Sequence, residues 1–320
     1  MSRASNVLWS LALFGCGGHA ESSGPDATIN PDPAIVFSGR ADGVSHIYTM
    51  NADGTGISQL TSGSDDDETP EWSPDGNKIV FQRSSDGLAV YTMNVDGSQL
   101  TRLSPTPGRD LLPGWSPDGS QIVYSYVITP PATPDDVPIT SIMAMNADGT
   151  DAQTLLDDNS FNMEPRWAPD GSKIAFMCGM PGVGIEVCTT NPDGSGLSML
   201  TNVQAANGDP HWSADSAHLA FSSNREGDGF VNVFVINADG TGSTQLTHFP
   251  AGQEAGDVGW SPDGATLVFE WDVNGNSQSD PDAHAEVWLM DVDGSNQRST
   301  GVSCSDVGCG PRWRPLTTAR

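Results

Sequence analysis

An oxygen-rich segment, residues 272–280, is the part of the sequence best suited to bind a metal ion. The proposed calcium ligands are Asp272, Asn274, Asn276 and Asp280. Their alternating spacing resembles the first part of an EF-hand loop, and calcium prefers such hard oxygen ligands. Ser277 stands where glycine is usual and Ala283 where a bidentate glutamate is usual, so a polar loop without metal stays open as the alternative. His284 adds zinc as a further alternative.

A second set of acidic residues occupies one repeated position, three residues before a tryptophan. These residues are Glu164, Asp209 and Asp257, ahead of Trp167, Trp212 and Trp260. Equivalent positions of a repeat meet around its axis if the repeat closes into a ring. The three carboxylates would then lie near the mouth of a central channel, where they could attract a cation or a basic partner. The alternative is that each accepts backbone hydrogen bonds where a loop meets a strand.

The sequence carries no recognisable catalytic motif. Gly114-Trp-Ser116-Pro-Asp and Gly259-Trp-Ser261-Pro-Asp superficially resemble the nucleophile elbow of hydrolases, but the final glycine comes one position late. The six histidines follow no common position in the repeat described below. We therefore expect a protein that is not an enzyme. The alternative is a cavity enzyme, a glycan lyase or hydrolase with its site in the central channel.

Charge excludes two classes of partner. The 320 residues include 13 Lys and Arg against 41 Asp and Glu, a formal net charge of −28. Such a surface repels the phosphate backbone of nucleic acids and anionic lipid headgroups. Contact with a membrane is therefore expected only through a lipid anchor at the N-terminus.

The N-terminal residues read as an export signal. A short apolar run, residues 7–15, has the length of a signal-peptide core and is too short to span a bilayer. It ends in Leu13-Phe14-Gly15-Cys16, which resembles the bacterial lipobox and implies lipidation of Cys16. Cleavage nearby, for example after Ala20, is the alternative. We expect anchoring to the outer membrane, or otherwise a periplasmic or secreted protein.

The remaining cysteines form two closely spaced pairs. These pairs are Cys178 with Cys188, and Cys304 with Cys309. Because exported proteins meet an oxidising compartment, we expect two disulfides. A four-cysteine metal site is the alternative, although neither pair has the usual CxxC spacing.

Two short signatures alternate along the rest of the chain. A Trp-Ser-Pro-Asp-Gly motif, or a close variant, begins at Trp72, Trp115, Trp167, Trp212 and Trp260, and a lone Trp313 ends the series. An Asn-x-Asp-Gly motif, with Asp in the last copy, begins at Asn51, Asn94, Asn146, Asn191, Asn237 and Asp291. Each motif has the residues of a tight turn and is flanked by short β-branched and aromatic runs. Each unit of about 45 residues therefore contains four antiparallel strands.

Repeats of this kind predict an all-β, six-bladed β-propeller of four-stranded antiparallel blades. The C-terminal strand is expected to complete blade 1 and close the ring. The predicted organisation is a signal peptide over 1–16, a flexible tether over 17–33, a propeller over 34–315 and a tail over 316–320. The predicted blades are 34–62 with 309–315, 68–103, 111–157, 163–200, 209–247 and 256–299.

The repeat as a whole resembles the TolB-type propeller repeat, also called WD40-like or PD40. The resemblance spans residues 34–315 and rests on the Trp-Ser-Pro-Asp-Gly and Asn-x-Asp-Gly motifs with the strands between them. It implies the propeller fold and a role in the cell envelope. TolB itself has an additional N-terminal α/β domain, whereas this chain offers a tether. Oligogalacturonate lyases resemble the same repeat and act through their central cavity.

The longer connections all fall at one end of the predicted propeller. They include residues 127–139 and 271–285, and they are rich in Asp and Glu. Variable loops on a rigid scaffold commonly bind partners. We therefore expect a monomeric binding or scaffolding module whose acidic, insertion-bearing face binds an envelope protein, peptide or polysaccharide.

Overall fold

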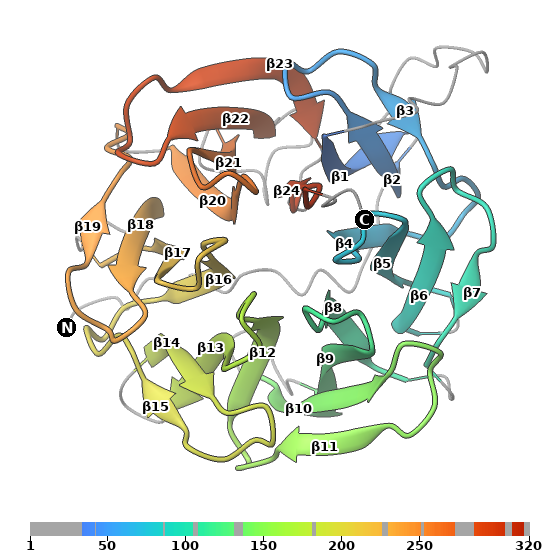
Figure 1. Cartoon of the computed structure of the whole chain (residues 1–320), viewed down its shortest axis with the longest axis horizontal. Coiled ribbons are helices and arrows are strands. Elements are labelled where there is room, and N and C mark those ends of the chain that lie inside the picture. Colours follow the sequence, from blue (N-terminus) through green and yellow to red (C-terminus); the bar gives the residue numbers. More distant parts are fainter. Residues whose placement is uncertain are drawn as a thin grey trace.

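The computed structural model describes residues 34–316 except 42, 86, 105–107, 131–136, 181–183, 226–229, 251–252, 273–284 and 305–308. This part of the chain contains 24 β-strands, which form six four-stranded antiparallel sheets. The sheets are arranged as blades around a central axis (Figure 1). The predicted six-bladed propeller is therefore confirmed.

The four strands of each blade follow one another from the axis outwards. Blade 1 contains β24 (Arg312–Trp313), β1 (Ile35–Ala41), β2 (Val44–Met50) and β3 (Ser58–Gln59). Blade 2 contains β4 (Asp67–Trp72), β5 (Lys78–Arg83), β6 (Ala89–Asn94) and β7 (Thr101–Arg102). Blade 3 contains β8 (Asp110–Trp115), β9 (Gln121–Thr129), β10 (Ile139–Asn146) and β11 (Gln153–Leu156). Blade 4 contains β12 (Phe161–Trp167), β13 (Ile174–Met180), β14 (Gly184–Thr190) and β15 (Ser198–Met199). Blade 5 contains β16 (Asn207–Trp212), β17 (His218–Ser223), β18 (Asn232–Asn237) and β19 (Thr244–Gln245). Blade 6 contains β20 (Glu254–Trp260), β21 (Thr266–Asp272), β22 (Ala285–Asp291) and β23 (Arg298–Cys304).

The ring is closed by the last strand of the chain. In β24, Trp313 pairs with Ile35 and Arg312 pairs with Val36 of β1. The backbone N–H of Arg314 also donates to the carbonyl of Ala34 at 2.7 Å. Closure pairs the inner edge of β1, which would otherwise be open in blade 1. The expectation that the C-terminal strand completes blade 1 is confirmed.

The hydrophobic core lies between adjacent blades. Along β5, Ile79 and Phe81 pack against blade 1, whereas Val80 packs against blade 3. A strand buried on both faces needs apolar side chains at successive positions, which explains runs such as Lys78-Ile-Val-Phe81. The same arrangement recurs around the ring. The apolar side chains are therefore buried in six interfaces between blades, and not in one central core.

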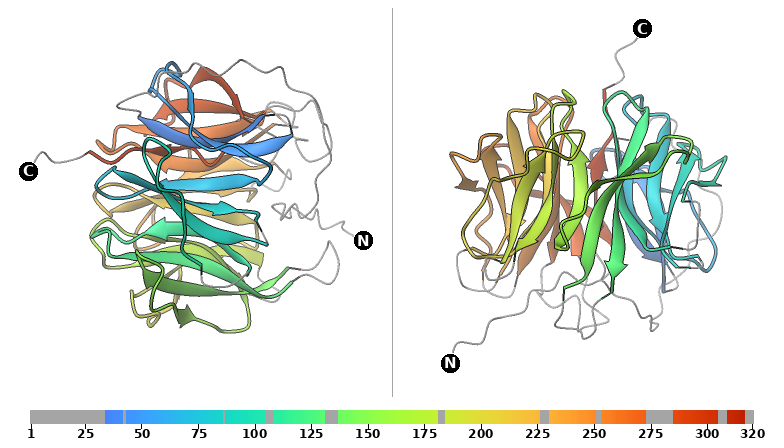
Figure 2. Two further views of the ribbon diagram at one scale, coloured as in Figure 1. Left: turned by 90° about the vertical axis from the view of Figure 1, so that its right-hand side faces the viewer. Right: turned by 90° about the horizontal axis from the view of Figure 1, so that it is seen from below.

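The two repeated motifs form the turns at one end of the propeller, which we call the turn face. Trp-Ser-Pro-Asp-Gly joins the first and second strands of a blade, and Asn-x-Asp-Gly joins the third and fourth. In the first motif the Ser73 hydroxyl donates to Asp75 Oδ1 at 2.6 Å. The opposite end, which we call the insertion face, carries the longer connections. Figure 2 shows the strands running between these two faces.

Gly149 is expected to resist substitution because the preceding blade leaves no room for a side chain there. It lies in the turn between the third and fourth strands of blade 3 at φ 85°, and a Cβ there would lie 2.6 Å from the carbonyl oxygen of Leu103 in the preceding blade. Gly264 has a similar φ of 71° but nothing within 4 Å of a Cβ. Both substitutions introduce backbone strain, so the clash at Gly149 should make Gly149→Ala more destabilising than Gly264→Ala by about 1–3 kcal/mol. Chemical denaturation of the two variants measures the difference, and equal losses would contradict it.

Both cysteine pairs are joined as disulfides. Cys178 and Cys188 lie on the neighbouring strands β13 and β14, with Cα atoms 5.8 Å apart. Cys304, at the end of β23, is joined to Cys309, with Cα atoms 5.5 Å apart. The second bridge ties the outermost strand of blade 6 to the segment that leads into the closing strand β24. The cysteines are thus not arranged as the four-ligand metal site that was the alternative.

Candidate functional site

The innermost strand of every blade carries the same backbone irregularity. Three residues before each repeat tryptophan, at what we call the bulge position, φ lies between 49° and 56°. The residues are Thr69, Leu112, Glu164, Asp209, Asp257 and Gly310. In five blades the strand register shifts at this point, as in a β-bulge. Left-handed backbone at non-glycine residues is costly, and it re-aims the chain towards the axis.

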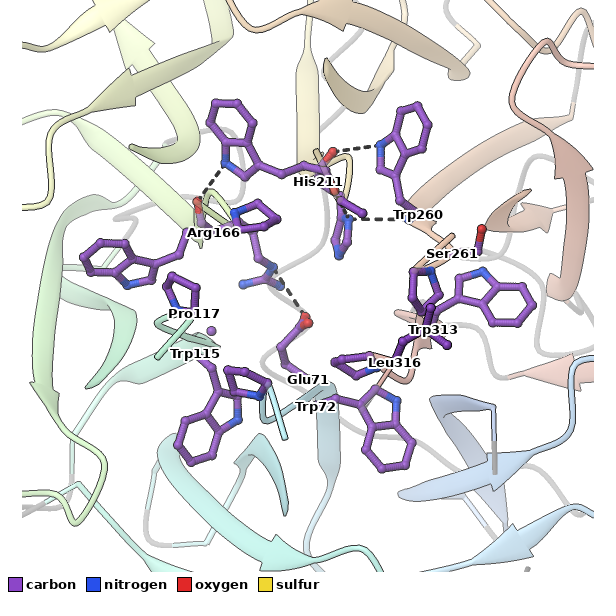
Figure 3. A pocket seen from close by; sticks show the side chains of 18 residues that line it. Glu71, Trp72, Trp115, Pro117, Arg166, His211, Trp260, Ser261, Trp313 and Leu316 are labelled. Atoms are coloured by element: carbon purple, nitrogen blue, oxygen red, sulfur yellow. Dashed lines mark hydrogen bonds and ion pairs between the residues drawn. The ribbon is translucent and has the colours of Figure 1, made fainter. Parts of the chain in front are cut away.

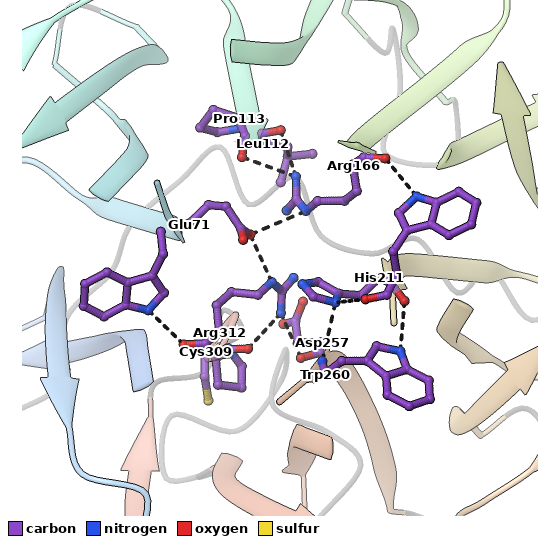
Figure 4. Close-up of polar contacts among 12 residues, drawn as sticks. Glu71, Leu112, Pro113, Arg166, His211, Asp257, Trp260, Cys309 and Arg312 are labelled. Atoms are coloured by element: carbon purple, nitrogen blue, oxygen red, sulfur yellow. Dashed lines mark hydrogen bonds and ion pairs between the residues drawn. The ribbon is translucent and has the colours of Figure 1, made fainter. Parts of the chain in front are cut away.

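The residue directly before each tryptophan, which we call the inner position, faces the central channel. Around the ring the inner positions are Glu71, Gly114, Arg166, His211, Gly259 and Arg312. Figure 4 shows Glu71, Arg166, His211 and Arg312 converging on the axis from four different blades. Around the ring, Gly114 directly precedes Arg166 and Gly259 directly precedes Arg312.

Each arginine lies across the glycine of the preceding blade. A Cβ on Gly114 would lie 3.0 Å from the carbonyl oxygen of Pro165 and 3.4 Å from Arg166 Nη1. A Cβ on Gly259 would lie 3.6 Å from Arg312 Cδ. The glycines therefore leave the space in which the two guanidinium groups are seated.

Backbone carbonyls of the bulges anchor both guanidinium groups. Arg166 Nη1 donates to the carbonyls of Leu112, Pro113 and Pro165 at 3.3, 3.3 and 3.1 Å. The second arginine repeats the arrangement, because Arg312 Nη1 donates to the carbonyls of Asp257 and Pro311 at 3.1 and 3.0 Å.

A single carboxylate lies between the two arginines. Glu71 Oε2 is 3.8 Å from Arg166 Nε and 3.4 Å from Arg312 Nε. The side chains of both arginines are buried, whereas that of Glu71 is 17% exposed. A buried carboxylate flanked by two cations spans the channel and fixes three blades relative to one another.

Above this triad the channel widens into a cavity of about 350 Å³, which we call the axial cup. Glu71, Arg166 and His211 line its floor, and Leu316 lies at its edge (Figure 3). Its wall carries one residue from each blade, two positions after the repeat tryptophan: Pro74, Pro117, Pro169, Ala214, Pro262 and Pro315. The cup opens at the turn face, and its size falls in the range of small-molecule and side-chain pockets.

The tryptophans of the repeat support the cup without offering their ring faces to it. Their indoles radiate away from the axis between the blades (Figure 3). Trp72 Nε1 donates to the carbonyl of Arg312, and Trp212 Nε1 to that of Arg166, both at 3.1 Å. Each of these two hydrogen bonds links the blade of the tryptophan to the inner strand of the preceding blade.

A layer of carboxyl groups lies beneath the triad, on the side of the insertion face. Glu164 hydrogen-bonds Asp209, and Asp257 hydrogen-bonds Glu270. Burial raises the pKa of Glu164, and it raises the pKa of Asp209 and of Glu270 strongly, with the neighbouring carboxylates adding to the effect. Asp209 and Glu270 are therefore harder to ionise than exposed carboxyl groups.

His211 is held neutral on the floor of the cup. Burial lowers its pKa well below the ordinary value, and the charges of Arg312 and Arg166 lower it further. Its Nδ1 lies 3.2 Å from the carbonyl of Trp212 and 3.4 Å from the backbone nitrogen of Trp260. His211 therefore contributes no positive charge to the cup near neutral pH.

The structure brings together the three bulge carboxylates that the sequence singled out. Glu164, Asp209 and Asp257 gather around the axis beneath the floor of the cup, and none of them lines it. Asp209 accepts a hydrogen bond from the Ser222 hydroxyl at 2.9 Å, so part of its role is to satisfy polar groups inside the protein. Among the described residues, no three His, Cys, Asp or Glu side chains are placed to hold a metal ion.

Other predicted site residues fall beyond the described part of the chain. Asp272 ends β21 and is buried, but Asn274, Asn276 and Asp280 lie outside the described residues. Cys16 and the tether lie outside them as well. The calcium loop and the lipid anchor stay predictions.

The inner positions were not recognised from the sequence. Their signal was available, because Glu71, Arg166, His211 and Arg312 all directly precede a repeat tryptophan. The inner position lies two residues after the bulge position, so once the bulge is known, the alternation of side chains along a strand directs both residues towards the axis. The bulge itself has no simple sequence signature, although a proline follows it in five of the six blades.

Comparison with known proteins gives the family. The model of the TolB β-propeller domain, PD40, matches residues 24–129 and 135–296. The chain belongs to this family. A search of curated proteins found no significant match.

Solved structures of the TolB propeller share the architecture at low sequence identity. TolB from Acinetobacter baumannii is 18% identical, with a TM-score of 0.72 over 89% of this chain and 67% of that one. A protein from Agrobacterium tumefaciens assigned as TolB is also 18% identical, with a TM-score of 0.67 over 89% of this chain and 100% of that one. An oligogalacturonate lyase from Vibrio parahaemolyticus is 15% identical, with a TM-score of 0.58 over 82% and 73%. At these identities the likeness concerns the fold alone.

Proposed function

We propose that this TolB-family propeller is a non-enzymatic binding module of the bacterial cell envelope, and that it holds a segment of a partner protein in the axial cup. The observation that carries the proposal is the cup itself, a cavity of about 350 Å³ with a rigid wall of five prolines and one alanine. Prolines lose little entropy when a ligand covers them, and the six-fold arrangement is fixed by the blades. A cavity of this size fits one or two side chains of a partner.

The cup is a better candidate than the acidic insertion face that the sequence favoured. Three of the described carboxylates of that face make contacts within the protein. Asp67 is buried and pairs with Arg83 Nε at 2.6 Å, and Asp66 accepts from the backbone N–H of Ser45 at 2.9 Å. Asp158 accepts from Asn162 Nδ2 at 2.7 Å. These acids position loops, which is the role weighed as the alternative for the bulge carboxylates.

A protein or peptide ligand fits the cup better than a polysaccharide. Sugar rings are commonly bound by stacking on the exposed face of an aromatic ring. All six repeat tryptophans contribute to the lining of the cup, but the indoles labelled in Figure 3, those of Trp72, Trp115, Trp260 and Trp313, extend outwards between the blades. Proline rings and small apolar contacts remain, and these suit an apolar side chain.

The proposed location is the cell envelope, with Cys16 as the lipid anchor to the outer membrane and a monomeric propeller on a tether. The lipobox-like Leu13-Phe14-Gly15-Cys16 supports export, and the two disulfides suit an oxidising compartment. Among the described residues, no helix has the length and hydropathy needed to cross a bilayer.

The enzymatic alternative would depend on three titratable residues. Glu71, Arg166 and His211 are the ones that line the cup. General acid–base catalysis needs a proton donor and a proton acceptor within reach of the substrate. Glu71 is flanked by two arginines, and the carboxyl pairs lie beneath the floor and do not line the cup, so His211 would have to act as a base without a matching acid. We therefore propose binding.

Photo-crosslinking from the wall of the cup tests the proposal. Ala214 is exposed on that wall at the position where the other blades carry proline, so it tolerates replacement by a photoreactive amino acid. In cells that express the full chain, irradiation should give a defined adduct with an envelope protein. The control is the same amino acid at Leu197, which is 40% exposed on the outer rim. Equal adducts from both positions, or none from Ala214, would contradict binding in the cup.

A further inference from the structure

We propose that Arg166, on the floor of the axial cup, and Arg312, buried against Glu71 just outside the lining of the cup, form a carboxylate clamp that Glu71 occupies from within, and that the ligand of the cup carries a carboxylate next to an apolar group. This inference rests on the proposed binding function of the same cup. It adds the chemical class of the ligand and a competitor built into the protein.

The anchoring of the two arginines leaves their other edges free for an anion. In both side chains Nη1 is committed to bulge carbonyls, so the Nε edge is the one turned towards Glu71 (Figure 4). Guanidinium groups bind carboxylates through such edges, and two that face one point from different blades make a clamp. The seats provided by Gly114 and Gly259 hold both groups in place before any ligand arrives.

Glu71 fills this clamp poorly. Charge-assisted hydrogen bonds between guanidinium and carboxylate are usually about 2.7–2.9 Å long. The two distances to Glu71, 3.8 and 3.4 Å, are longer, and Glu71 Oε2 and Arg312 Nε each have no hydrogen-bond partner. The Arg312 side chain is only 6% exposed, so its unused donor is buried. A buried donor without an acceptor is costly, and a better-placed oxyanion would remove that cost.

Charge also favours an anion at this point. Two guanidinium groups against one carboxylate leave a local excess of one positive charge in a chain whose formal net charge is −28. The carboxyl pairs beneath the floor cancel less of it than their number suggests, because burial raises the pKa of Glu164, Asp209 and Glu270. An anionic ligand that enters the cup from the turn face therefore meets a pair of guanidinium groups next to its floor.

The position of Glu71 allows a ligand to displace it. Its side chain is 17% exposed and lines the cup, whereas the arginine side chains are 9% and 6% exposed and are held by backbone. A ligand carboxylate that enters past the proline wall would take the place of the Glu71 carboxylate and leave its own apolar group against the prolines. Peptide C-termini and free amino acids with a blocked amine both have this chemistry.

Calorimetric titration with N-acetyl-leucine and its uncharged analogue N-acetyl-leucinamide tests the clamp. Glu71→Ala removes the internal competitor, and it should bind N-acetyl-leucine at least tenfold more tightly than the natural protein does, with no comparable gain for the amide. Glu71→Gln keeps the shape without the charge, and it serves if the smaller variant does not fold. Adding Arg166→Gln to either variant should abolish binding, whereas adding Arg298→Gln, an exposed arginine on β23, should not.

Several results would overturn the clamp. Equal binding of the acid and the amide, or no binding of the acid by either folded Glu71 variant, would show that no carboxylate site exists. Inorganic phosphate binding as tightly as N-acetyl-leucine would replace it by a general anion site. Crosslinking from Ala214 is independent of these results, because a partner without a carboxylate could still occupy the cup. The two proposals therefore fail separately.

Discussion

Asp209→Asn is expected to stabilise the protein at neutral and alkaline pH. Burial, followed by the charges of Glu164 and Asp257, raises the pKa of Asp209 well above its ordinary value. Asparagine has nearly the same shape, and its amide oxygen can still accept the hydrogen bond that the Ser222 hydroxyl donates to Asp209. The substitution thus removes a buried acid that is costly to ionise while it keeps the packing. The gain at pH 8 should be about 1–3 kcal/mol in the free energy of unfolding.

The pH dependence gives this prediction a sign. A carboxyl whose pKa is higher in the folded than in the unfolded chain binds its proton more tightly when folded. Its contribution to stability is complete below the unfolded pKa, about 4, and is lost as the pH rises through the folded pKa. The natural protein should therefore lose stability as the pH rises from about 4, and Asp209→Asn should flatten that decline.

Calorimetric melting between pH 4 and pH 9 measures both effects. Asp148→Asn is the matched control with the opposite sign. Asp148 is exposed, and the hydrogen bonds from the Thr150 hydroxyl and backbone N–H lower its pKa. Its contribution is present above the unfolded pKa and lost as the pH falls, so its replacement should lower the melting temperature at neutral pH. A lower melting temperature for Asp209→Asn at pH 8 would mean that the acid layer is stabilised by ionised, ligand-bound carboxylates.

The fold was predictable because its determinants are local. Asp-Gly turns such as Asp96-Gly97 set positive φ at fixed spacing, and runs such as Ile79-Val-Phe81 are buried on both faces, so each blade specifies itself. The six-fold count and the closing strand follow from the mismatch between the two motifs. Both can be predicted from the order of the motifs, without knowledge of any contact between distant residues.

The site was predictable only in part, because its geometry joins distant blades. Repeat position alone was enough to group Glu164, Asp209 and Asp257. The triad depends on which side chains face one another across the axis, and Glu71 and Arg312 are far apart in sequence. The cup at the turn face was not predicted, because loop length indicates variability, whereas a cavity depends on how small the wall residues of every blade are.

Removal of the closing strand is expected to have the largest effect of all. A chain that ends at Gly310 keeps the disulfide of Cys309 but loses β24, and with it the Arg312 carbonyl that accepts from Trp72 Nε1 and the bond from Arg314 N–H to Ala34. It also leaves Glu71 with Arg166 alone. Each lost hydrogen bond costs about 0.5–1.5 kcal/mol and the inner edge of β1 becomes unpaired, so the truncation removes a large share of the about 5–15 kcal/mol that stabilises a typical domain.

We therefore expect the chain that ends at Gly310 to melt without a cooperative transition and to be cleaved rapidly by protease, whereas a chain that ends at Leu316 should match the full protein. Circular dichroism melts and limited proteolysis of the two truncations distinguish these outcomes. If the shorter chain melted cooperatively at a similar temperature, the blades would be stable by nearest-neighbour packing alone, as in open repeat arrays. A cooperative loss would instead mean that closure couples all six blades, and that the clamp at the axis is held rigid by the ring as a whole.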